Sequence, residues 1–208
     1  MITSVKTPPA PLEKAALGLV FISVTIWSAI DPADGLTWWL EALPAIFLFI
    51  ALVATQRAFP LTRITTWAIY ALLLMMMVGA HYTYSAVPPF DWLKEQFDLS
   101  RNHYDRVSHA LQGVTVALFA REITRRTIEV RRSATLFALI ILATLGVSAG
   151  CELVEWLAAE IFDDGAMEFL GMQGDVWDAQ KDMGLALIGA FVTISLFRKT
   201  KDRQIDGT

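Results

Sequence analysis

Long apolar stretches separated by short polar segments dominate this sequence. A helix that crosses the hydrocarbon core of a membrane needs about 20 mostly apolar residues, and six stretches approach that length. These stretches are residues 15–30, 36–55, 64–84, 105–123, 134–159 and 174–197. No stretch alternates apolar and polar residues with the period of two that a membrane β-barrel requires. The pattern therefore predicts an all-α, polytopic membrane bundle of about six transmembrane helices.

The composition supports a membrane location. Of the 208 residues, 55% are hydrophobic and 18% are charged, whereas soluble domains are roughly 45–50% apolar and about 25% charged. The surplus of apolar surface has to face lipid. We expect one transmembrane domain over residues 15–198, with an N-terminal tail over residues 1–14 and a C-terminal tail over residues 199–208.

The basic residues predict the orientation. Thirteen of the 17 Lys and Arg residues lie before the first stretch, between the second and third, between the fourth and fifth, or after the sixth. Short cytoplasmic loops are enriched in Lys and Arg, so both termini are predicted to be cytoplasmic. Membrane topology explains these basic residues, so we expect no nucleic-acid partner. The expected partner is membrane lipid. Glu122, which lies among them, is interpreted as a surface charge.

Residues 87–97 are too polar to span a membrane, but they are not featureless. Phe90, Leu93 and Phe97 recur at helical spacing, which is typical of an amphipathic helix lying in the membrane interface. We predict such a helix on the outer face, between the third and fourth spans. It serves either as a lid over a site beneath it or as a simple connector.

Acidic and histidine side chains interrupt the apolar stretches near their predicted outer ends. Because consecutive spans run in opposite directions, topology puts these side chains at one depth, and within each stretch they are spaced i,i+3 or i,i+4 on one helix face. An ionisable group inside a bilayer is costly and by default marks a functional site. The residues singled out are Asp105, His109, Glu152, Glu155, Asp178 and Asp182.

Three further polar residues, His81, His103 and Asp175, fall at the same end. We place them in the same polar cluster. For two of them, Asp175 and His103, a structural role without any site is an alternative interpretation. Asp is a preferred N-cap residue, so Asp175 is equally interpretable as the cap of the sixth helix. His103 precedes the fourth helix, where a histidine can simply face water.

Several carboxylates brought together repel one another unless protons or a cation neutralise them. Mixed carboxylate and imidazole donors suit Zn or Mn, and oxygen donors suit Mg. The sequence therefore predicts a divalent-metal site for Zn, Mn or Mg, with Glu152 or Glu155 acting as general base. The predicted metal ligands are Asp105, His109, Glu155, Asp178 and Asp182.

Three functions are compatible with such a site. The first is a metal-dependent hydrolase or transferase that acts on a lipid or lipid-linked substrate at the outer leaflet. The second is a proton- or cation-coupled transporter, although the polar residues gather at one side only and no inverted repeat is visible. The third is a scaffold whose polar cluster joins the helices. Nothing in the pattern indicates an oligomeric state.

Residues 81–113, the segment ELVEW at 152–156 and the segment GDVWDAQKDMGLALIGA at 174–190 resemble the YjdF-like family of bacterial inner-membrane proteins. The resemblance covers most of the chain from the third span onward. It implies a multi-pass protein of the bacterial inner membrane, and it implies no particular activity.

A weaker similarity is to VanZ-like membrane proteins. That family pairs an Asp and a His at the start of one span, as Asp105 and His109 are paired here, and follows them with a Glu late in the next span. An Asp then opens the following span, here Asp178, and an Asn is expected some turns later, where this chain has Asp182. The similarity implies chemistry of the cell envelope.

Overall fold

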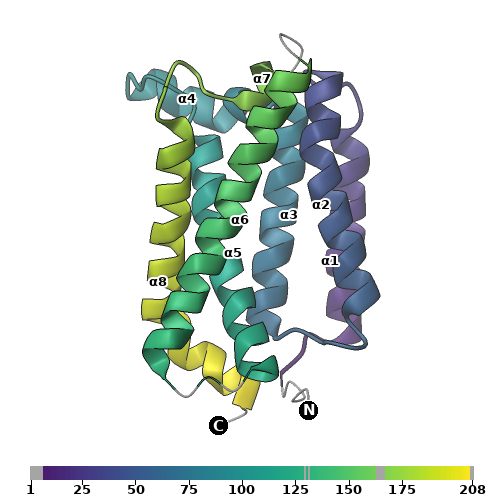
Figure 1. The fold of residues 1–208 in the computed structure, drawn as a ribbon. Helices are drawn as coiled ribbons and strands as arrows, with labels where there is room; N and C mark the ends of the chain where they lie inside the picture. The colour runs from purple at the N-terminus through teal and green to yellow at the C-terminus, as the bar shows by residue number, and fades with distance from the viewer. Residues whose placement is uncertain (1–6, 129, 131, 163–166, 207–208) are drawn as a thin grey trace.

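Six long helices run up and down in chain order and form one bundle (Figure 1). The computed structural model describes residues 7–128, 130, 132–162 and 167–206, and these residues contain no strand. The long helices are α1 (Pro11–Ser28), α2 (Gly35–Thr55), α3 (Arg63–Tyr82), α5 (Tyr104–Thr127), α6 (Ser133–Phe162) and α8 (Asp178–Asp206). Three short helices join them, η1 (Tyr84–Ala86), α4 (Pro88–Gln96) and α7 (Met167–Leu170). The predicted all-α polytopic bundle is confirmed.

Five of the long helices are long and apolar enough to cross a membrane, and α5, the sixth long helix, is not among these five. Its 24 residues span about 36 Å, more than the roughly 30 Å of a hydrocarbon core. Because α5 packs against α3, α6 and α8, its polar residues face other helices. Surrounding helices therefore make a less hydrophobic span acceptable.

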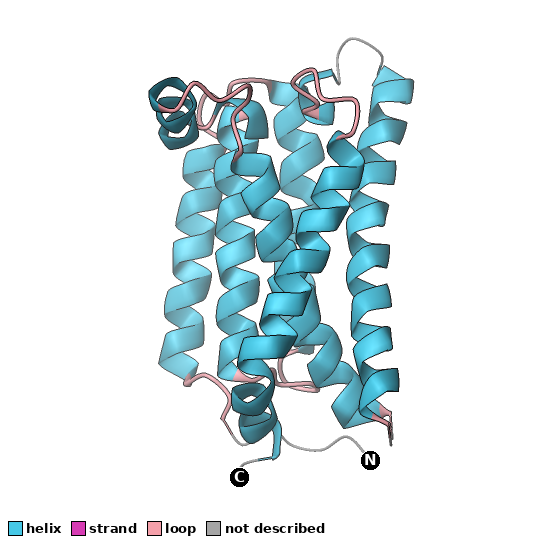
Figure 2. Ribbon diagram, turned by 90° about the vertical axis from the view of Figure 1, so that its left-hand side faces the viewer, coloured by secondary structure: helices cyan, strands magenta, loops and turns pink. Residues whose placement is uncertain are grey.

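The helix boundaries follow local chemistry. The interfacial helix predicted over residues 87–97 is observed as α4, which has Pro88 in its first turn and lies across the end of the bundle (Figure 2). The predicted sixth span starts later than expected, because Gly171 and Gly174 take positive φ values of 60° and 83° in the preceding loop. At its other end α8 continues to Asp206, so most of the segment expected as a tail is helical.

The bundle has two parts joined through α3 and α5. One core cluster fills the space between α1, α2 and α3, with Phe21, Ala42 and Leu73 at its centre. A smaller cluster joins α5, α6 and α8 around Ala117 and Ile140. The seam between α2 of the first part and α6 of the second holds the cavity described below.

Two glycines let α5 and α8 approach each other closely. A Cβ atom at Gly113 would lie 1.8 Å from the carbonyl oxygen of Ala186, and one at Gly189 would lie 2.1 Å from that of Ala110. Small residues permit such backbone contact between membrane helices, where lipid supplies no hydrophobic drive for association. The contact holds the acidic residues of α8 against those of α5.

We expect Gly189→Ala to lower the free energy of unfolding by about 1–3 kcal/mol, because the added methyl group forces the two backbones apart. Gly184→Ala, on the same helix, meets nothing within 4 Å, and it should be neutral or stabilising by about 0.5–1 kcal/mol. Thermal unfolding of both variants in detergent measures the difference. Equal melting temperatures for the two would contradict the close-contact argument.

A buried charge cluster anchors the last turns of α8, at the end of the bundle away from α4. The ammonium group of Lys201 donates hydrogen bonds to the hydroxyl groups of Thr62 and Thr65 and to the carboxylate of Glu122. The Glu122 carboxylate also accepts a hydrogen bond from Arg126 at 3.0 Å. Glu122 and Lys201 are both 0% exposed. The interpretation of Glu122 as a surface charge is therefore wrong, because α8 folds its last turns over it.

Candidate functional site

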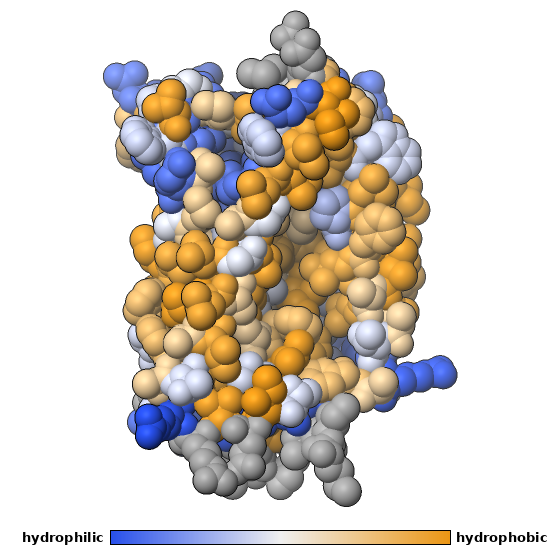
Figure 3. Space-filling view, in the orientation of Figure 1, coloured by the Kyte–Doolittle hydropathy of each residue, from blue (hydrophilic) through white to orange (hydrophobic). Residues whose placement is uncertain are grey.

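Three helices bring six ionisable side chains together near the end of the bundle where α4 lies. They are Asp105 and His109 of α5, Glu152 and Glu155 of α6, and Asp178 and Asp182 of α8, and we call them the acid–histidine cluster. All six were singled out from the sequence. Figure 3 shows polar side chains in a recess at this end, bordered by apolar surface.

The imidazole of His109 lies at the centre of the acid–histidine cluster. Its Nε2 atom is 3.5 Å from a carboxylate oxygen of Asp105 and 3.5 Å from one of Glu152. Its Nδ1 atom lies 3.4 Å from the hydroxyl of Ser148. The second ring nitrogen therefore has a polar neighbour, as the ring of a metal-binding histidine usually does.

The donor atoms fall into two sets that could each hold a metal ion. His109, Glu152 and Glu155 form one set, and the three aspartates of the cluster form the other. Within each set the donor atoms lie within 4.8 Å of one another. The first set mixes nitrogen and oxygen donors, and the second offers only oxygen.

Two arginines partly neutralise the acid–histidine cluster. Arg101, which is 2% exposed, donates a hydrogen bond to Asp178 and lies 3.8 Å from Asp105. Arg106 lies 3.7 Å from Asp178 and 2.5 Å from Asp175. Two guanidinium groups against the cluster's five carboxylates, which are buried or half-buried, leave an excess of negative charge that protons or a further cation would neutralise.

Two carboxylate oxygens inside the acid–histidine cluster lack a hydrogen-bond donor among the described residues. They are Oε1 of Glu152 and Oδ1 of Asp182. Asp182 is only 1% exposed, and a buried polar atom without a partner costs about 1–3 kcal/mol. Oε1 of Glu152 faces Nε2 of His109 at 3.5 Å, which leaves the Asp182 oxygen as the atom that still needs a proton or a cation.

A cavity of about 300 Å³ adjoins the acid–histidine cluster in the seam between α2 and α6. Asp105, His109 and Glu155 line its polar end, and Leu170 and Gly171 cover it on the side of α7. The remaining walls are largely apolar. They come from Leu40 and Pro44 of α2, Leu72 and Met76 of α3, and Val147 and Val154 of α6. The cavity therefore joins a charged end to a largely apolar space.

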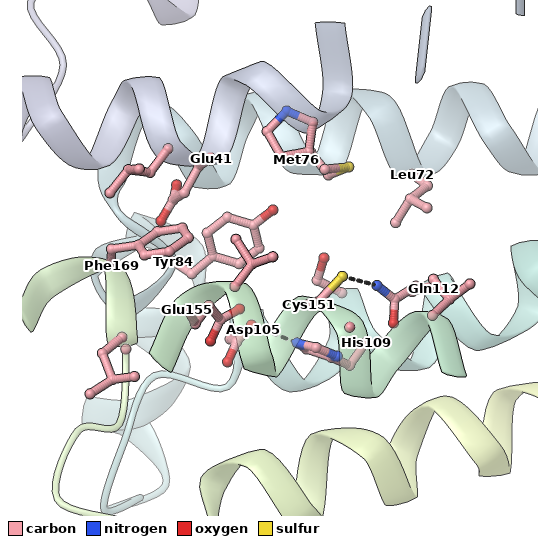
Figure 4. A pocket seen from close by; sticks show the side chains of 18 residues that line it. Glu41, Leu72, Met76, Tyr84, Asp105, His109, Gln112, Cys151, Glu155 and Phe169 are labelled. Atoms are coloured by element: carbon pink, nitrogen blue, oxygen red, sulfur yellow. Dashed lines mark hydrogen bonds and ion pairs between the residues drawn. The ribbon is translucent and has the colours of Figure 1, made fainter. Parts of the chain in front are cut away.

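Glu41 of α2 is the functional candidate that the sequence analysis did not single out. It is 7% exposed, it lines the cavity, and its Oε2 atom has no hydrogen-bond partner in the described part of the chain. Figure 4 shows it across the cavity from Asp105 and Glu155. Its signal was present, because it is an acidic residue within an apolar stretch, as Glu152 and Glu155 are.

The three remaining polar residues have separate places. Asp175 lies at the rim, where a hydrogen bond from Lys181 lowers its pKa to about 2. His103 lies 3.4 Å from Arg106, and burial together with that guanidinium group lowers the pKa of His103. His81 lies away from the cluster, against the rings of Trp27 and Tyr82.

The helix α4 is tied to the loop before α5. The side-chain amide of Asn102 donates hydrogen bonds to the carbonyl oxygen of Val87 at 3.0 Å and to Asp91 at 2.9 Å. The described lining of the cavity includes α7 and the residue after it, and it includes none of α4. Of the two alternatives for residues 87–97, this favours the connector.

Comparison with known proteins gives two matches. The model of a family described as predicted membrane protein (DUF2238) matches residues 14–203. The inner membrane protein YjdF of Escherichia coli (strain K12) is 41% identical over 197 residues, which cover 95% of this chain and 93% of that protein. No solved structure shows a significant match.

Proposed function

We propose that this chain, which belongs to the DUF2238 family of predicted membrane proteins, is a metal-dependent hydrolase or transferase acting on a lipid-linked substrate. Membership of this family agrees with the YjdF-like resemblance of residues 81–113, 152–156 and 174–190. The observation that carries the proposal is the surplus of buried and half-buried carboxylates with an unpaired Asp182 oxygen. A divalent cation satisfies both the charge and the unpaired atoms.

The acid–histidine cluster would hold the ion. His109 of α5 supplies a nitrogen donor and Glu152 and Glu155 of α6 supply oxygen donors in one set, and Asp105, Asp178 and Asp182 supply only oxygen donors in the other. Such a mixed set suits Zn²⁺ or Mn²⁺, and the aspartate set alone suits Mg²⁺. A bound divalent ion supplies the Lewis acidity that polarises a phosphoryl or acyl oxygen.

The cavity supports a substrate that carries both a polar head and a lipid chain. Asp105, His109 and Glu155 face one end of the space, and the aliphatic side chains of α2, α3 and α6 form the rest. A lipid chain could enter along the seam between α2 and α6, directly from the bilayer. The head group would then lie beside the acid–histidine cluster, at the level of the membrane interface.

Glu155 is the better placed of the two proposed general bases. It lines the cavity, whereas Glu152 lies behind it against His109. A carboxylate beside the substrate can take a proton from an attacking water or hydroxyl group. We assign proton transfer to Glu155 and positioning of the ion to Glu152.

The same proposal includes the orientation. The described chain ends meet at one end of the bundle, where the hydroxyl of Thr7 donates to the carbonyl oxygen of Gln204 at 3.4 Å. That end also carries most of the Lys and Arg residues, so we propose that it faces the cytoplasm in the inner membrane. The acid–histidine cluster then faces the outer leaflet, where envelope lipids are available.

Metal content of the purified protein tests the proposal. After incubation with Zn²⁺, Mn²⁺ or Mg²⁺ and removal of excess ion, the wild-type chain should retain metal in stoichiometric amount. Asp182→Asn should weaken retention by at least about 10–100-fold, the loss typical even of outer-shell changes. Glu160→Gln, on the exposed surface of α6, is the matched control and should retain the metal.

Two results would contradict the proposal at different steps. A wild-type protein that retains no metal would exclude the metalloenzyme and favour a protonated cluster. A protein that binds metal and moves cations across vesicle membranes, but does not turn over lipid phosphates or lipid-linked sugars, would favour transport. Metal-dependent turnover of a lipid-linked substrate that is lost in Glu155→Gln would support the enzyme.

A further inference from the structure

A second cavity lies at the end of the bundle opposite the acid–histidine cluster. It has a volume of about 630 Å³ and lies between the start of α1, the end of α2 and the first turns of α3. Ligand-binding pockets typically measure about 300–1,000 Å³. We call this space the α1–α2 groove, and its location makes it independent of the proposed enzyme.

Most residues in the wall of the α1–α2 groove are apolar, and several of them are exposed on the surface of the bundle. Leu19 and Ile22 of α1 and Val53 of α2 line it and remain 65%, 45% and 44% exposed. Phe49 and Tyr70 also line it, beside Gly18. Exposed aliphatic walls of this kind suit acyl chains.

Two cations stand at the polar end of the α1–α2 groove. Lys14 in the first turn of α1 and Arg57 after the end of α2 both line it, and none of the described lining residues is acidic. The nearby Glu13 is occupied elsewhere, by hydrogen bonds from Arg63 at 2.8 Å and from Trp67 at 2.5 Å. The groove therefore offers positive charge to a ligand without a competing carboxylate in its described wall.

The groove is bounded by rigid chain. Pro8, Pro9 and Pro11 line its wall at the entry to α1, and Pro60 lines it in the connection to α3. Proline fixes the backbone torsion φ and so limits collapse of the wall. This part of the wall therefore has a restricted backbone.

We infer that the α1–α2 groove binds one anionic phospholipid, with its phosphate between Lys14 and Arg57 and its acyl chains along Leu19, Ile22 and Val53. Basic pockets between transmembrane helices bind anionic head groups through this combination of charge and apolar surface. The end of the bundle that carries the groove is rich in Lys and Arg, so in the orientation proposed above the lipid comes from the cytoplasmic leaflet.

Native mass spectrometry of the full chain in detergent, titrated with phosphatidylglycerol or phosphatidylcholine, tests the inference. We expect one phosphatidylglycerol to bind more tightly than phosphatidylcholine. The double variant Lys14→Gln, Arg57→Gln should lose about 30-fold in affinity for it, because two cationic contacts are removed. The matched control, Lys199→Gln with Arg203→Gln, removes two exposed charges at the same end and should leave the affinity unchanged.

A second variant tests the apolar part. Gly18→Leu places a side chain toward Phe49 and Tyr70 and should block the acyl chains without changing charge. Equal affinity for the two lipids, or unchanged binding in the Lys14, Arg57 variant, would overturn the inference. Binding that appears only after residues 1–6 are deleted would also overturn it, because the chain itself would then occupy the groove.

Discussion

Removing bound divalent metal with a chelator is expected to lower the melting temperature of the purified wild-type protein by about 5–10 °C. A ligand present at 100 times its dissociation constant stabilises a protein by about 2.7 kcal/mol. For a chain of this size each kcal/mol corresponds to about 2–4 °C. The loss arises because the carboxylates of the acid–histidine cluster face only Arg101 and Arg106 among the described cations nearby once the ion is gone. Thermal unfolding in detergent, before and after metal is returned, measures the effect.

The variant Asp182→Asn should change stability in opposite directions with and without metal, relative to the wild type. It removes one buried negative charge, so without metal it should be more stable than the metal-free wild type, and it should respond weakly to added metal. The control Glu160→Gln should behave as the wild type does. A wild type that ignores the chelator, together with an Asp182→Asn variant that is stabilised at every metal concentration, would show that protons rather than a metal neutralise the cluster.

Replacing Glu122 by glutamine is expected to destabilise the protein by about 3–5 kcal/mol, because it leaves buried cations without their carboxylate. The Glu122 carboxylate accepts hydrogen bonds from the amide and hydroxyl of Thr62 at 2.9 and 2.8 Å, from Thr65 at 2.9 Å, and from Arg126 and Lys201. The melting temperature should fall by about 6–20 °C. Thermal unfolding in detergent at neutral pH measures it.

Adding Lys201→Met to Glu122→Gln should recover part of that loss, since the unpaired ammonium group is removed. Arg126 keeps other contacts, with the carbonyl oxygen of Pro60 at 2.7 Å and with the ring of Phe59. The comparison variant Asp202→Asn breaks the half-buried ion pairs of Asp202 with Arg121 and Arg125, and it should cost less than Glu122→Gln, because Asp202 is partly open to water and Glu122 is fully buried. No recovery in the double variant would mean that Glu122 acts through its threonine contacts alone.

The acid–histidine cluster could be predicted because the sequence shows where a charged side chain lies within an apolar stretch, and burying such a charge costs free energy. Glu152 is surrounded in the chain by apolar residues, and a charge in that position has to meet a partner from another helix. The alternating direction of the spans then fixed which end of the bundle each side chain would reach. Glu41 satisfied the same criterion, so it could have been predicted from the sequence. The burial of the last turns of α8 could not.

The sequence by itself determined the number of long helices, their alternation and the end of the bundle that each polar residue reaches, because membrane thickness and the cost of buried charge act on one helix at a time. Only the tertiary structure decided the direction in which each side chain points around its helix. His81 has the depth of the cluster but packs on Trp27, and Glu122 and Lys201 lie in polar segments yet are fully buried. Both outcomes depend on how helices rotate and bend against one another, which hydrophobic length does not specify.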